Sequence, residues 1–200
     1  MITFVHWLVI LSAAINITGS VFYIKNTIQG TTKPNKVTWL MWGAAPMIGT
    51  FAALSLHSDP WVTSRIFLAG FFPLVVFIAS FINPKSYWKI TKFDVACGLL
   101  SLVALIIWLF MGQARTAILV AALADLFAAL PTIIKCWKYP ETETGFTFAL
   151  GLLSVLLILP SIQVWNIENA SFQVYLLVVN IILVFSVYRK HLSFINPLKN

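Results

Sequence analysis

Charge is scarce in this 200-residue chain. Charged residues make up 10% of it and only 6 residues are acidic, whereas 60% are hydrophobic and the mean hydropathy is +0.92. Such a composition leaves no room for a soluble domain of any size, because a water-exposed surface needs a larger charged fraction. The chain is therefore expected to lie mostly inside a membrane.

The residues that build most metal and catalytic sites are also few. The sequence has two cysteines, Cys97 and Cys136, and three histidines, His6, His57 and His191. The histidines are too scattered for a metal site or a catalytic triad, and both cysteines are expected near cytoplasmic helix ends, where thiols stay reduced. No glycine-rich phosphate loop or zinc-protease motif is present. We therefore expect no enzyme, no metal and no cofactor, and we interpret the cysteines as packing residues.

What the chain does contain is a series of seven apolar stretches separated by short gaps. A hydrocarbon core of ~30 Å needs about 20 apolar residues per helix, whereas transmembrane strands are shorter and alternate in polarity. The sequence therefore predicts an all-α polytopic membrane protein with antiparallel neighbours in sequence. Its seven predicted transmembrane helices are Ile2–Tyr23, Val37–Leu56, Thr63–Phe81, Phe93–Met111, Thr116–Cys136, Phe146–Val164 and Phe172–Tyr188.

The basic residues lie almost entirely in alternate gaps. Of 13 lysines and arginines, only Arg65 and Arg115 fall on one side of the predicted membrane. Basic loops stay on the cytoplasmic side, so we predict an integral protein of a plasma membrane, a prokaryotic inner membrane, with the N-terminus outside and the C-terminus in the cytoplasm. The net charge of +7 is then a topology signal whose partner is anionic membrane lipid, and no nucleic acid is implied. The residues on the basic side are Lys25, Lys33, Lys36, Lys85, Lys89, Lys92, Lys135, Lys138, Arg189, Lys190 and Lys199.

The ends of the first and fifth predicted spans resemble each other. Both place Ile-Lys at the predicted membrane boundary, at positions 24–25 and 134–135, and both are followed by a short polar loop and two further spans. Because three spans invert the chain, one extra crossing lets a second copy take the same orientation, and the copies are then parallel repeats. We therefore predict a 3+1+3 organisation, with three-helix repeats at 1–82 and 113–200 and a linker helix within 83–112.

With these residues the chain resembles the PQ-loop family, which includes SWEET and SemiSWEET sugar transporters and lysosomal cystine and cationic amino-acid exporters. That family carries Pro-Gln in the cytoplasmic part of the first helix of each repeat, followed by an apolar-apolar-Lys-Asn-like turn. The second copy here has Pro131-Thr132, and the first has Val21-Phe22 followed by Tyr-Ile-Lys-Asn at 23–26. The resemblance implies a divergent member that moves a small-molecule solute by alternating access. SWEET-like proteins also associate, so formation of a homo-oligomer stays open.

Six unusual residues fall near the membrane centre when depth is measured from the ends of the predicted spans. A polar side chain at that depth is expensive and normally faces the interior of a helical bundle. The predicted linker helix contributes none of the six, which indicates a central cavity shared by the two repeats. The residues are Asn16, Pro46, Pro73, Asp125, Ser154 and Asn180.

Asp125 is the leading candidate, because it is the only acidic residue well inside a predicted span. Insertion of a central aspartate costs ~2.5–3.5 kcal/mol, and no lysine or arginine inside the membrane is available to offset it. Burial disfavours the charged form, so one hypothesis is a carboxyl that couples transport to a proton. The alternative is a hydrogen-bonded Asp125 that holds helices together.

Asn16, Trp42, Ser154 and Asn180 are the predicted substrate-binding residues. Related sugar carriers have an asparagine in the last helix that bonds solute hydroxyls and a tryptophan that stacks on the solute, and the resemblance implies these roles for Asn180 and Trp42. The alternative for the polar side chains is an interhelical hydrogen bond. Trp39 is instead predicted to be a residue of the interfacial aromatic belt.

Three prolines fall inside predicted spans where the resembling family carries hinges, namely Pro46, Pro131 and Pro160. Each removes a backbone hydrogen bond and can kink its helix. The alternative is a static kink that only shapes packing.

Together these features predict a membrane transporter for a sugar-like or amino-acid-like solute, either facilitative or proton-coupled through Asp125. Two alternatives stay open. The segment Trp39-Leu40-Met41-Trp42 resembles the tryptophan motifs of nicotinamide riboside carriers, which makes a vitamin precursor the alternative solute. The lack of Pro-Gln in the first repeat favours a non-transporting membrane sensor, chaperone or assembly protein on the same fold.

Overall fold

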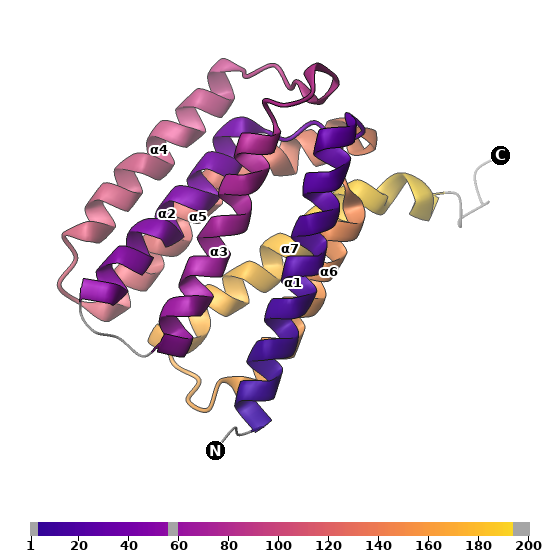
Figure 1. Ribbon diagram of the computed structural model, residues 1–200. Helices are drawn as coiled ribbons and strands as arrows, with labels where there is room; N and C mark the ends of the chain where they lie inside the picture. The colour runs from indigo at the N-terminus through magenta and orange to yellow at the C-terminus, as the bar shows by residue number, and fades with distance from the viewer. Residues whose placement is uncertain (1–3, 56–59, 194–200) are drawn as a thin grey trace.

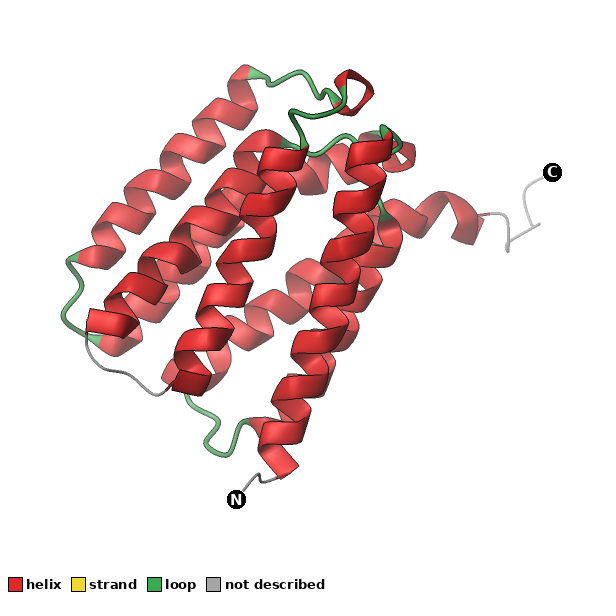
Figure 2. Ribbon diagram, in the orientation of Figure 1, coloured by secondary structure: helices red, strands yellow, loops and turns green. Residues whose placement is uncertain are grey.

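The computed structural model describes residues 4–55 and 60–193, and these form an all-helical bundle without a strand (Figure 2). His57 and Lys199 lie outside the described ranges. The α-helices are α1 (Phe4–Gln29), α2 (Lys36–Ser55), α3 (Pro60–Ala79), α4 (Lys92–Leu109), α5 (Ala114–Lys138), α6 (Gly145–Ile158) and α7 (Ile167–Ser193). Three single turns of 3₁₀ helix complete the fold, η1 (Pro84–Ser86), η2 (Pro140–Thr142) and η3 (Leu159–Ser161).

Five of these helices, α1, α2, α4, α5 and α7, are long and apolar enough to cross a membrane. The other two contain shorter apolar stretches, Thr63–Ala79 in α3 and Gly145–Ser161 at α6. The 14 residues of α6 rise only about 21 Å along the helix axis. The prediction of an all-helical fold is therefore confirmed, five helices are long and apolar enough to span a membrane, and α6 is shorter than the predicted span Phe146–Val164.

Some helix ends differ from the predicted boundaries. The prediction placed the end of the first span at Tyr23, but α1 continues to Gln29. The sixth span was predicted to reach Val164, but α6 ends at Ile158 and Pro160 lies in η3. Because proline lacks a backbone N–H, it cannot continue the hydrogen-bond ladder. The position predicted as a hinge inside a helix is thus a helix end.

The helices pack in the same pattern in the two halves of the chain (Figure 1). In the first half α3 lies between α1 and α2, and in the second half α7 lies between α5 and α6. The two halves meet where α1 packs on α6 and where α2 packs on α5. Helix α4 lies at the outside of the bundle against α5 and α2, and α7 crosses behind the other helices at an oblique angle (Figure 1).

The loops 30–35, 80–91 and 139–144 gather at one end of the bundle, which we name the basic end (top of Figure 1). Local chemistry fixes the helix ends there. Gly30 has φ +83° just after α1, a conformation that glycine adopts without a steric penalty. The Asn35 carboxamide oxygen accepts hydrogen bonds from the amides of Val37 and Thr38 and caps α2. Asp94 is buried because it forms a capping box with Thr91 at the start of α4.

Packing is tight in the half of the bundle next to the basic end. The hydrophobic core cluster, built around Tyr23, Trp39, Val76 and Leu183, lies in that half. The largest side chains that are fully inaccessible to solvent also lie there, namely Tyr23, Leu183, Val76, Asn35, Thr27, Thr32, Thr38, Thr132, Pro34, Cys136, Ser86 and Ser186. The prediction that Trp39 belongs to an interfacial belt is wrong, because its side chain is 5% exposed within this core.

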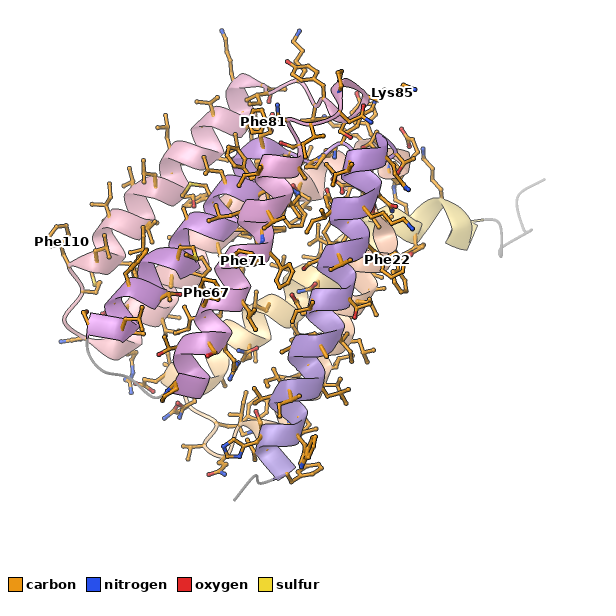
Figure 3. All side chains as sticks on the ribbon, in the orientation of Figure 1. Phe22, Phe67, Phe71, Phe81, Lys85 and Phe110 are labelled. Atoms are coloured by element: carbon orange, nitrogen blue, oxygen red, sulfur yellow. The ribbon has the colours of Figure 1, made fainter. Side chains whose placement is uncertain are left out.

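Aromatic side chains cover the outside of the bundle. Phe22, Phe67 and Phe71 are exposed along the helices, Phe81 lies at the basic end near Lys85, and Phe110 at the opposite end of α4 is 83% exposed (Figure 3). A soluble protein rarely exposes so much apolar surface. The outer surface therefore fits contact with lipid.

The close packing of α2 on α3 gives the first testable prediction. A Cβ atom added at Gly70 would lie 2.9 Å from the Gly43 carbonyl oxygen and 2.9 Å from the Met47 amide nitrogen, both backbone atoms that cannot rotate away. We expect Gly70→Ala to lower the free energy of unfolding by about 1–3 kcal/mol, measured by thermal unfolding in detergent.

The matched control for this experiment is Gly49→Ala on α2. A Cβ atom there would approach only the Ile66 Cγ2 atom, at 3.4 Å. Because alanine also favours a helix over glycine, the control should unfold at the wild-type temperature or above it. Equal melting temperatures for both variants would contradict the close approach of the two helices.

Candidate functional site

Asp125 lies in the middle of α5 and is partly exposed to solvent. Its carboxylate oxygen Oδ2 accepts a hydrogen bond of 2.7 Å from the Tyr175 hydroxyl of α7. The buried indole N–H of Trp42, on α2, lies near this carboxylate but makes no hydrogen bond to it. Three helices from both halves of the chain therefore meet at one acidic side chain, and we name Asp125, Tyr175 and Trp42 the acidic site.

The acidic site contains no compensating positive charge. Among the described residues Asp125 makes no ion pair, and both of its neighbours are neutral hydrogen-bond donors. Hydrogen bonds to a carboxylate stabilise its ionised form, but they do not cancel its net charge. The site therefore attracts a proton or another cation.

Asn16 lies at a gap in the packing of α1. The buried residues Ser12, Gly19, Ser20 and Tyr23 fall within one face of the helix, because successive residues turn by about 100°. Asn16 falls in the middle of the same face, yet its side chain is exposed. The neighbouring helices thus leave Asn16 uncovered, although they cover the residues on the same face one turn before and one turn after it.

Ser154 and Asn180 lie in close contacts between helices. The Ser12 and Ser154 hydroxyl oxygens are 2.9 Å apart, and the Ser154 hydroxyl also donates to the Ser12 carbonyl at 3.1 Å, which joins α1 to α6. The Asn180 amide donates to the Leu176 carbonyl of its own helix, and its Oδ1 lies 2.7 Å from where a Cβ of Gly151 would be. The structure brings Trp42 to Asp125 and places Ser154 and Asn180 elsewhere. Ser154 makes the interhelical hydrogen bond of the alternative interpretation, whereas Asn180 bonds within its own helix and packs against Gly151.

Tyr175 is the member of the acidic site that the sequence analysis missed. The predicted seventh span began at Phe172, which placed Tyr175 near the membrane boundary where tyrosines are common. Helix α7 begins at Ile167, so Tyr175 lies two turns inside the helix. A buried tyrosine hydroxyl usually needs a hydrogen-bond partner, and a correct helix start would have pointed to this residue.

Two of the three predicted hinge prolines lie inside helices. Pro46 is in α2 and Pro131 is in α5, while Pro160 is in η3 as described above. Pro131 is buried and lies between Asp125 and the basic end of α5. The freed backbone groups of α2 and α5 are therefore close in sequence to the acidic site.

A buried ion pair closes the basic end. The Lys135 ammonium is 2.5 Å from Glu143 Oε1, and the two side chains are 1% and 0% exposed. The Tyr23 hydroxyl donates to the other oxygen of Glu143 at 2.6 Å, and the Trp39 indole N–H donates to the Tyr23 hydroxyl at 3.3 Å. Lys135 also donates to the Lys33 carbonyl. These residues link both halves of the chain, and we name them the basic-end network.

The loops add further links to this network. The Thr32 and Thr144 hydroxyl oxygens are 2.5 Å apart, and the Asn26 amide donates to Thr144 at 3.1 Å. The Lys33 amide donates to the Thr142 carbonyl at 2.9 Å. The sequence analysis counted Lys135 among loop charges and missed its partner Glu143. Lys135 is buried because Glu143 and the Lys33 carbonyl, from the two neighbouring loops, cover its ammonium group.

Two surface grooves flank α7. One, of about 520 Å³, lies between α5 and α7 near the basic end and has an almost wholly apolar lining that includes Ile133 and Phe185. The other, of about 590 Å³, lies at the start of α7 and is lined by Trp165, Asn166 and Tyr175. The second groove therefore reaches a residue of the acidic site. In the part of the chain that the structure describes, no three His, Cys, Asp or Glu side chains are grouped to hold a metal ion.

Comparison of the chain with protein-family models, with curated proteins and with solved structures found no match. The function is therefore argued from the acidic site and the packing around it.

The basic-end network gives the second testable prediction. Removing one partner of a buried ion pair leaves an unpaired charge and costs about 3–5 kcal/mol. We expect Lys135→Met and Glu143→Gln each to lower the free energy of unfolding by that order. The double variant Lys135→Met/Glu143→Gln should recover part of the loss, measured by unfolding in detergent.

The matched control is Glu141→Gln, which removes the exposed pair of Glu141 with Lys190 at 3.6 Å. Exposed pairs contribute about 0–1 kcal/mol, so this variant should unfold close to the wild type. A Glu143→Gln protein as stable as Glu141→Gln would contradict the buried pair.

Proposed function

We propose that this protein is a membrane carrier that moves a small polar solute by alternating access. In this proposal α1–α3 and α5–α7 are two parallel repeats and α4 is the linker between them. The shared packing pattern supports the proposal, since the third helix of each triplet lies between the other two, and the contact of α1 with α6 corresponds to that of α5 with α2. All seven helices then cross the membrane, with α6 as the shortest.

The acidic site is the observation that carries the proposal. An aspartate at the membrane centre costs ~2.5–3.5 kcal/mol, and such residues mark solute or proton pathways. Asp125 is partly exposed, lies where α2, α5 and α7 meet, and has only neutral partners. A solute path between the repeats explains why an aspartate lies inside the membrane without a lysine or arginine as its partner.

The uneven packing supports a carrier that is closed at the basic end. The basic-end network and the hydrophobic core cluster fill that half of the bundle, whereas Asn16 lies exposed within the contact face of α1. The distribution of lysine and arginine makes the basic end cytoplasmic. The structure then corresponds to a state closed towards the cytoplasm, and transport requires the basic-end network to open.

A second candidate is a non-transporting membrane protein on the same fold. The pairs Ser12–Ser154 and Asn180–Gly151 favour it, because they use polar groups for helix packing. The two candidates differ in one observable. A carrier has water next to Asn16, and a scaffold has a sealed bundle there.

The first test of the proposed function is a flux assay. A thermal-shift screen against sugars, amino acids and vitamin precursors first identifies a solute by ligand-specific stabilisation, and proteoliposomes then measure its uptake. We expect Asp125→Asn to abolish dependence on the pH gradient while sparing solute exchange, because an amide cannot bind and release the proton.

The control for this assay is Asp94→Asn, which carries the same chemical change in the capping box of α4. It should lower stability but keep the dependence on the pH gradient. Gradient-driven uptake that is unchanged in Asp125→Asn would rule out coupling through this carboxyl.

The second test measures access of water to the cavity. The native cysteines Cys97 and Cys136 are both buried, so the wild type gives a low background with a membrane-impermeant maleimide. We expect Asn16→Cys to be labelled from the side opposite the basic end. Ala14→Cys, at a similar depth but on the outward face of α1, should stay unlabelled. Equal absence of labelling in both variants would favour the scaffold over the carrier.

A further inference from the structure

The charge at the acidic site limits which solutes it can hold. The ionised Asp125 carries one negative charge, and its Tyr175 and Trp42 partners are neutral. The helices and the turn that contact α5 are α2, α4, α7 and η2. Their charged side chains in the described ranges, and those of α5 itself, lie towards the helix ends, and they are Lys36, Lys92, Asp94, Glu168, Arg189, Lys190, Glu141, Arg115, Lys135 and Lys138.

The other groups of the site suit a cation better than a sugar. A neutral polyol needs several donors and acceptors around its hydroxyls, but the Tyr175 hydroxyl already donates to Asp125, which leaves the Trp42 N–H as the one unused donor of the acidic site. The rings that carry these two donors are held by aromatic neighbours. Trp42 packs edge-to-face on Trp39 with 5.3 Å between ring centroids, and Tyr175 lies 5.8 Å from Phe172. Aromatic faces attract organic cations most strongly where water is excluded.

The approach to the site also suits a cation. A shallow, open depression at the start of α7 reaches Tyr175. Arg115 is the basic residue at that end of α5, and its guanidinium is paired with Glu168 at 2.9 Å. Apart from Arg65, near the start of α3, the remaining lysines and arginines of the described residues lie towards the basic end, away from a cation that enters beside Tyr175.

We propose that the solute is a small monovalent organic cation, a quaternary ammonium or pyridinium compound, which exchanges with a proton at Asp125. This inference rests on the proposed carrier function and names its substrate class. When the cation binds, the protonated carboxyl releases one proton and the resulting carboxylate pairs with the cation. The site stays neutral in both states, so one proton moves out for each cation that moves in.

The test uses pairs of ligands that share shape and differ in charge. Choline is compared with its neutral isostere 3,3-dimethylbutan-1-ol, and 1-methylnicotinamide with nicotinamide, by thermal shift of the purified protein. We expect a saturable rise in melting temperature with at least one cation and none with its neutral counterpart. The shift should grow as pH rises, because the proton competes for the same carboxylate.

Variants distinguish binding at the acidic site from unspecific binding. Asp125→Asn should weaken cation binding more than tenfold and remove the pH dependence of the shift, so that any remaining exchange needs a high cation concentration. Tyr175→Phe should weaken cation binding about tenfold because one hydrogen bond to the carboxylate is lost. Asp94→Asn should keep the wild-type affinity. In proteoliposomes an outward proton gradient should drive uptake of the binding cation.

The experiments distinguish failure of the cation inference from failure of the carrier function. If neither cation shifts the melting temperature more than its neutral partner, or if Asp125→Asn keeps the wild-type affinity, the cation inference is overturned. Transport of a neutral sugar or amino acid by the same preparation would then leave the carrier function standing. Absence of labelling at Asn16→Cys would instead remove the carrier function itself.

Discussion

Polar groups inside a membrane must find their partners within the protein, because lipid offers none. This constraint acts at two places in the bundle with opposite results. At the basic end Lys135 and Glu143 neutralise each other. Glu143 also accepts a hydrogen bond from Tyr23 and Lys135 donates one to the Lys33 carbonyl, so the halves of the chain are held together. At the acidic site Asp125 has donors but no opposite charge, so its charge can be balanced only by something that enters from outside.

The basic-end network stabilises the structure, and the acidic site serves the proposed function. A buried pair with satisfied hydrogen bonds is costly to break and changes little with the surroundings. A single carboxylate with neutral partners responds to each proton or cation that reaches it. In the proposed carrier, the basic-end network therefore suits a gate that opens as a unit. The acidic site suits a binding site whose occupancy changes in every transport cycle.

The sequence predicted the features that depend on single residues and on composition. The all-helical bundle followed from the long apolar stretches, and Asp125 was singled out because no other acidic residue lies deep in a span. The sequence could not predict hydrogen-bond partners whose positions depend on where helices begin and end. The predicted seventh span began at Phe172, five residues after the actual start of α7, so Tyr175 fell near the predicted membrane boundary. Trp39 was assigned to the interface because its hydrogen-bond partner Tyr23 lies on another helix and could not be foreseen. Glu143 is only eight residues from Lys135, but the burial of Glu143 depends on how the loops 30–35 and 139–144 fold.

The order of features along α5 connects the acidic site to the closure. Asp125 comes first, then Pro131, then Lys135. Pro131 cannot donate to the Phe127 carbonyl, one turn earlier, so the backbone of α5 is weakest between the site and the ion pair. Pro46 likewise leaves the carbonyl of Trp42 without its helical donor. The weak point of α5 therefore lies between the acidic site and the basic-end network, whereas that of α2 lies on the far side of Trp42 from the basic end. In the proposed carrier, bending of α5 at its weak point would move Lys135 relative to Glu143 without unfolding either half.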